Sequence, residues 1–200
     1  MPPSEMRTSD RLIAALNYVF LLAAAGTIAA ILAAALALQL GKGELPCPLC
    51  LLERAAMFGA AFAMLQNLRH EYSSRNTGIL LGFALFLLVV AVRQTLLDIY
   101  PRPGHAYIGS AVLGLHMPVW SVLIAVALIA AVALKLALLG GDSHMRGARP
   151  SSFPLLGRLA PFLALVLIGL ALANFVLVVV QCGLGECHTE GYALLGNSLP

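Results

Sequence analysis

Charged side chains are scarce in this sequence. Only 10% of its 200 residues are Asp, Glu, Lys or Arg, whereas 60% are hydrophobic, and an ordinary soluble domain has about 25% charged residues. Because about 20 apolar residues cross a bilayer core, the sequence predicts an all-α integral membrane protein without an internal repeat or a separate soluble domain. Five predicted spans cover about Leu12–Leu40, Leu51–Leu68, Gly78–Leu97, Pro118–Leu139 and Leu159–Val180.

Basic residues are distributed unevenly between the two ends of the predicted spans. Five spans place the two termini on opposite faces of the membrane, and basic residues concentrate on the cytoplasmic face. The sequence therefore predicts a cytoplasmic N-terminus and an extracytoplasmic C-terminus. The face of the N-terminus has eight basic residues on it or near it, Arg7, Arg11, Arg69, Arg75, Lys135, Arg146, Arg149 and Arg158, against four on the other, Lys42, Arg54, Arg93 and Arg102.

No cysteine lies inside a predicted span, which argues against a role as a small core hydrophobe. The four cysteines form two close pairs just outside helix ends, Cys47 with Cys50 and Cys182 with Cys187. By the predicted topology, all four thiols face the oxidising compartment. Closely paired cysteines in such a compartment are expected to form disulfides, so the pattern predicts redox or disulfide chemistry.

The C-x-x-C motif Cys47–Cys50 stands where the chain enters the second span. Free N–H groups at a helix start favour a thiolate, and a disulfide across so small a loop is easily reduced. The placement therefore predicts a catalytic pair. Arg54, in the first turn and four residues after Cys50, is predicted to stabilise the thiolate or to bond a bound acceptor, unless it only extends to the interface. Glu53 is assigned to another helix face, where it complements the helix dipole.

The second pair lies in the tail that follows the fifth span. Four residues separate Cys182 from Cys187, and two of them are glycines that let the chain turn back on itself. The sequence predicts a bonded loop that meets a soluble partner and then reaches the C-x-x-C motif. Thiol–disulfide exchange through mixed disulfides requires no more than that contact.

Several short motifs together resemble the DsbB family. The resemblance covers about residues 12–139 and implies a four-helix bundle core, to which this chain adds a fifth C-terminal span. The DsbA–DsbB–quinone system keeps the bacterial periplasm oxidising. The motifs are Pro46–Cys50 followed by Glu53-Arg54 and Met57-Phe58-Gly59, Ile99-Tyr100-Pro101 after the third span, and Gly114–Trp120 before the fourth.

The resemblance implies a bacterial inner-membrane enzyme that reoxidises a periplasmic thioredoxin-like, DsbA-like dithiol oxidase. It implies electron transfer to a membrane quinone, ubiquinone or menaquinone, with no metal. By resemblance, Cys47–Cys50 is the quinone-proximal disulfide, Cys50 faces the quinone, Arg54 contacts it, and Cys182–Cys187 is the partner-facing disulfide. Familiar members carry their second pair between spans three and four, but residues 98–117 contain no cysteine here. The pair is therefore predicted to have moved to the tail.

The predicted organisation has three parts. Residues 1–139 form the four-span core, residues 140–158 a cytoplasmic linker, and residues 159–200 the fifth span with its cysteine tail.

Three other functional hypotheses stay open. The first is a metal site, since four thiolates can bind zinc, although the compartment favours disulfides. The second is a non-enzymatic protein with structural disulfides, and the third an enzyme resembling vitamin K epoxide reductase, with electrons flowing in the other direction.

Overall fold

Five long helices account for most of the described chain. The computed structural model describes residues 8–70, 72–100, 111–139, 153–183, 185, 187 and 191–195. All five helices are long and apolar enough to cross a membrane, which confirms the predicted transmembrane helix bundle. The helices are α1 (Thr8–Lys42), α2 (Pro48–Arg69), α3 (Ser74–Ile99), α4 (Met117–Leu139) and α5 (Pro154–Cys182), and a short 3-10 helix, η4, covers Ala193–Leu195.

The helices extend beyond the predicted apolar spans at several ends. In particular, α2 begins at Pro48 rather than near Leu51, and α5 begins at Pro154 rather than near Leu159. Proline suits the first helical turn, where its missing N–H removes no hydrogen bond. The earlier start of α2 moves Arg54 from the predicted first turn into the second turn.

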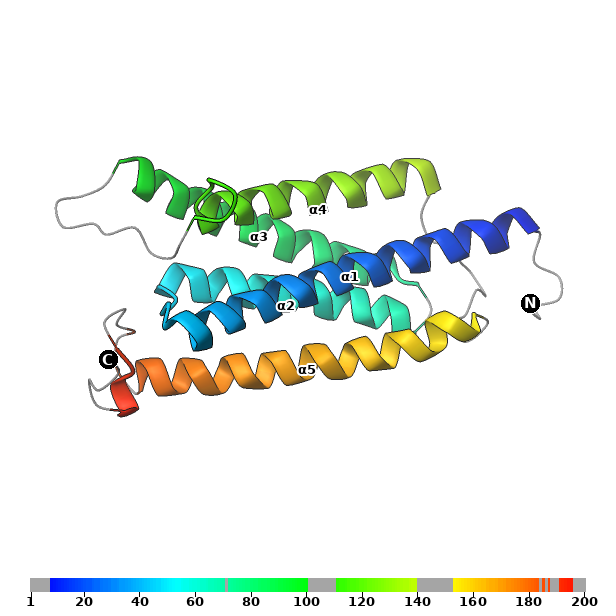
Figure 1. The fold of residues 1–200 in the computed structure, drawn as a ribbon. Helices are drawn as coiled ribbons and strands as arrows, with labels where there is room; N and C mark the ends of the chain where they lie inside the picture. The colour runs from blue at the N-terminus through cyan, green and yellow to red at the C-terminus, as the bar shows by residue number, and fades with distance from the viewer. Residues whose placement is uncertain are drawn as a thin grey trace.

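Helix α2 lies at the centre of the bundle. It packs against α1, α3 and α5, while α4 packs mainly on α3 and α5 packs also on α1, as the side-by-side helices of Figure 1 show. Small residues on α2 permit a close approach to α3, since a Cβ added to Gly59 would lie 2.4 Å from the Phe83 ring. Small residues at helix interfaces are typical of membrane bundles.

One end of the bundle brings both cysteine pairs together. Helix α1 ends there, α2 begins there and α5 ends there (Figure 1). The side-chain amide of Gln181 donates a hydrogen bond of 2.9 Å to the Pro46 carbonyl oxygen, which ties the end of α5 to the turn before α2. The predicted placement of all four cysteines at one end of the spans is therefore present in the fold.

Lys135, at the opposite end of the bundle, is buried and is not a solvated surface charge. Its ammonium group donates to the hydroxyl of Tyr72, which also accepts a 2.9 Å hydrogen bond from the Thr77 hydroxyl.

Several residues used in the topology prediction lie outside the described part of the chain, as do residues 140–152 of the predicted linker. These residues are Arg7, Arg102, Arg146 and Arg149.

Candidate active site

The C-x-x-C motif forms the start of α2. Cys47 is the N-cap residue, with an extended backbone, and its Sγ accepts a 3.1 Å hydrogen bond from the backbone N–H of Cys50. Ser, Thr, Asp and Asn usually fill this role, which a sulfur atom takes here. Pro48 follows as the first helical residue, and Cys50 therefore lies in the first turn among N–H groups that favour a thiolate.

Gln94 of α3 contacts both sulfur atoms of the motif. Its side-chain Nε2 donates to Cys47 Sγ at 3.4 Å and to Cys50 Sγ at 3.2 Å. A donor to the charged form of an acid stabilises that form, so Gln94 favours a thiolate at this pair. Gln94 was not among the site residues predicted from the sequence, although a glutamine inside a predicted apolar span is a signal of function.

The two cysteine pairs differ in bonding. Cys47 and Cys50 are free thiols, the first buried and the second half-buried, so the predicted bond between them stays a prediction. The side chain of Cys50 and burial raise the pKa of the Cys47 thiol above its ordinary value. Cys182 and Cys187 are joined in a disulfide with a Cα–Cα distance of 4.2 Å, and Cys182 is the more buried of the two. The redox role of both pairs stays a prediction.

Arg54 is held between α1 and α5. One guanidinium nitrogen donates to Gln39 Oε1 at 2.7 Å and to Asn174 Oδ1 at 3.2 Å, and the other donates to the Ala35 carbonyl oxygen at 3.3 Å. These bonds direct the side chain into the bundle rather than outward to the membrane interface. Because all three acceptors are neutral, the positive charge of the guanidinium stays available to a ligand.

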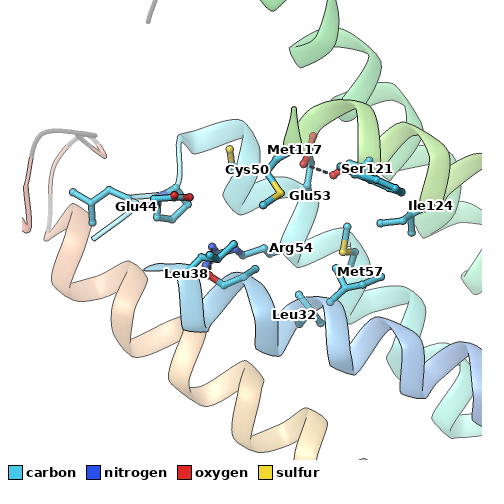
Figure 2. A pocket seen from close by; sticks show the side chains of 15 residues that line it. Leu32, Leu38, Glu44, Cys50, Glu53, Arg54, Met57, Met117, Ser121 and Ile124 are labelled. Atoms are coloured by element: carbon cyan, nitrogen blue, oxygen red, sulfur yellow. Dashed lines mark hydrogen bonds between the residues drawn. The ribbon is translucent and has the colours of Figure 1, made fainter. Parts of the chain in front are cut away.

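A cavity of about 130 Å³ lies beside Cys50. An apolar cavity of about 150 Å³ can hold a benzene molecule, so the space matches one six-membered ring. Figure 2 shows the Cys50, Glu53, Arg54 and Ser121 side chains around it, with apolar walls. Those walls come from α1, α2 and α4 and include Leu32, Leu38, Met57, Met117 and Ile124.

Glu53 lies in this cavity, so its assignment to another helix face is wrong. Residues three and four apart share a helix face, which places both Glu53 and Arg54 on the face of Cys50. The Glu53 side chain is 5% exposed, and its Oε2 accepts a 2.7 Å hydrogen bond from the Ser121 hydroxyl of α4. The other oxygen, Oε1, is buried without a hydrogen-bond partner among the described residues.

A protein-family model described as disulfide bond formation protein DsbB matches residues 17–106. This part of the chain is similar to the DsbB family. The matched residues lie in a chain whose described part has five helices long and apolar enough to cross a membrane. Neither a search of curated proteins nor a search of solved structures finds a match.

The DsbB match covers most of α1 and all of α2 and α3, and it ends before α4 and α5. It is shorter than the resemblance that the sequence motifs indicated, which extended to residue 139. Within it lie the C-x-x-C motif, Glu53, Arg54 and Gln94. The hydrogen-bonding side chains that come from outside it include Ser121 of α4 and, from α5, Asn174 and Gln181. The fifth helix therefore contributes directly to the candidate site.

A metal site stays an untested alternative for the described part of the chain. No group of three or more His, Cys, Asp or Glu side chains there could hold a metal ion. Moreover, Cys182 and Cys187 are bonded to each other, and a sulfur atom in a disulfide is no longer a thiolate ligand.

Proposed function

We propose that the chain is a quinone-dependent protein-disulfide oxidoreductase of the bacterial inner membrane. Its substrate is the dithiol of a soluble thioredoxin-like, DsbA-like oxidase on the periplasmic side, where the C-terminus and both cysteine pairs lie. The N-terminus is cytoplasmic. One observation carries the proposal: a free thiol at a helix start, Cys50, lines a ring-sized cavity together with the charged Arg54.

The first exchange takes place at the tail disulfide. A thiolate of the partner attacks Cys187, the more exposed sulfur of the pair, and releases Cys182 as a thiol. The partner's second thiol then resolves the mixed disulfide, so that two partner thiols become a disulfide and the tail pair becomes two thiols. Cys182 follows Gln181, whose side chain bonds the residue before Cys47. This contact supports attack by Cys182 on an oxidised Cys47–Cys50 pair as the next step.

The reduced C-x-x-C pair donates electrons at the cavity. Gln94 and the N–H groups of α2 stabilise the Cys50 thiolate, while Arg54 provides a charged donor for an acceptor oxygen. Leu32, Met57 and Ile124 provide the apolar walls that a flat ring requires. A quinone such as ubiquinone or menaquinone, when bound here, accepts two electrons and two protons.

Quinone reduction by the purified protein tests the proposal. The donor is a reduced thioredoxin-like oxidase, and the wild type is compared with Cys50→Ala and Cys182→Ala. Loss of turnover in both variants supports the relay from tail to motif to quinone. Full activity of Cys182→Ala would make the tail pair structural, and a wild type that does not reduce quinone would sink the whole proposal.

The direction of electron flow separates the proposal from the reductase alternative. Reduced quinone and oxidised partner are supplied in a second reaction, and the free thiols of the partner are counted. An oxidase leaves the partner oxidised under these conditions, whereas an enzyme that works like vitamin K epoxide reductase produces partner thiols.

A further inference from the structure

Glu53 is a buried carboxyl group whose function the thiol exchange leaves unexplained. Its side chain is 5% exposed, and among the described residues its hydrogen-bond partner is the Ser121 hydroxyl and no basic side chain pairs with it. Burial of an unpaired charge costs so much free energy that such groups are usually neutral. An acid kept in this environment, on the wall of a cavity, indicates that it serves a ligand.

The contact with Ser121 orients the carboxyl group. The hydroxyl donates to Oε2 at 2.7 Å, so Oε2 is the acceptor oxygen, and in the neutral acid the proton belongs to Oε1. Oε1 is the atom without a partner, and Glu53 lines the same cavity as Cys50 and Arg54. Figure 2 shows these three side chains coming from one stretch of α2, with Ser121 approaching from α4.

We propose that Glu53 is the proton donor to the quinone in this cavity, with Oε1 bonded to a quinone oxygen and Ser121 as its positioning residue. The inference rests on the proposed function. Arg54 cannot fill this role, because a guanidinium remains protonated in proteins. The two groups therefore divide the work, with Arg54 supplying charge and Glu53 supplying a proton.

The step balances in atoms and electrons. Cys47 and Cys50 form an S–S bond and lose two electrons and two protons in total, and the quinone gains two electrons and two protons to become a hydroquinone. Glu53 gives the proton on Oε1 to one quinone oxygen and takes back a proton that the cysteine pair releases. The carboxyl group thus ends the cycle as it began and relays one of the two protons.

Infrared difference spectroscopy of quinone binding tests the hydrogen bond without turnover. Ubiquinone is added to protein in which Cys50→Ser blocks electron transfer, and the carbonyl band of a protonated carboxyl group is followed. We expect this band to shift on quinone addition and to be missing when Glu53→Gln is also present. The band should persist with Asp98→Asn, which removes an acid from α3 that does not line the cavity. A shift unaffected by Glu53→Gln would overturn the proposal.

Single-turnover kinetics tests the proton transfer. Pre-reduced Glu53→Gln protein, which retains Cys50, is mixed with ubiquinone, and we expect oxidation of the C-x-x-C pair to slow by about a hundredfold, the lower range for loss of a general acid. Exchange between partner and tail should keep its rate. Glu53→Asp keeps the carboxylic acid and should recover part of the rate. This variant also serves as the test if the Glu53→Gln protein does not fold.

The outcomes separate this inference from the proposed function. If wild-type protein neither binds nor reduces quinone, the proposed function itself fails. If wild type reduces quinone and Glu53→Gln does so at the same rate, only the role of Glu53 is refuted. Ser121→Ala provides an independent check, since we expect it to shift the Glu53 carbonyl band even before quinone is added.

Discussion

Replacing Gln94 with leucine isolates its effect on the reactive thiols. The side-chain amide donates to Cys47 Sγ at 3.4 Å and to Cys50 Sγ at 3.2 Å, and Gln94→Leu removes both contacts with little change in volume. The substitution also removes Gln94 Oε1, which is buried without a hydrogen-bond partner among the described residues. The fold is therefore expected to keep its stability.

The size of the effect follows from the loss of a hydrogen bond to a charged group, which contributes about 1.5–3 kcal/mol. Sulfur is a weak acceptor, so we take the lower end, about 1.5 kcal/mol. A change of that size lowers the thiolate population about tenfold. Because Gln94 stabilises the reduced pair, its loss favours the disulfide and moves the reduction potential about 30 mV more negative.

Two measurements check this prediction. Reduced protein in detergent is alkylated with iodoacetamide at a fixed pH, and the rate at Cys50 is followed by mass spectrometry. The C-x-x-C pair is then equilibrated with dithiol buffers to obtain its potential. The neighbouring variant Thr95→Val is the control, since the Thr95 hydroxyl bonds the Ala91 carbonyl oxygen of its own helix. The reasoning would be refuted if the Gln94→Leu alkylation rate were within twofold of the wild-type rate and its reduction potential within about 10 mV of the wild-type potential.

Three further predictions concern neighbouring features. Asn174→Ala removes one of the three acceptors that hold Arg54. It should raise the KM for quinone severalfold without changing the alkylation rate of Cys50, whereas an unchanged KM would mean that α5 does not position the guanidinium. Gly59→Ala places a Cβ 2.4 Å from the Phe83 ring and should destabilise the bundle by about 1–3 kcal/mol. A thermal unfolding scan in detergent measures this loss, and an unchanged Tm would contradict it. Because the pKa of Cys47 is raised, this residue should keep its proton at pH 8 and react with iodoacetamide after the other thiol of the motif, and equal labelling would contradict that order.

The helices and the helix-start position of the C-x-x-C motif were predictable from local sequence. Membrane spans depend on the length and apolarity of consecutive residues, and a proline after Cys47 favours a helix start. The helix ends were less predictable, because a helix also continues beyond its apolar run, as α2 does by beginning at Pro48 and α5 by beginning at Pro154. Within α2, the spacing of Cys50, Glu53 and Arg54 already determines one shared face, so the position of Glu53 beside Cys50 was predictable from the sequence.

The sequence by itself determined which residues cross the membrane, that both cysteine pairs stand at helix ends, and that an arginine lies one turn from a thiol. Only the tertiary structure decided which groups complete the site: Gln94 of α3, Ser121 of α4, Asn174 and Gln181 of α5. The physical reason is that helix formation depends on neighbours in the chain, whereas these contacts depend on how separate helices pack and rotate against one another. Gln181 and Pro46 meet across 135 residues of sequence, and no local pattern encodes that meeting.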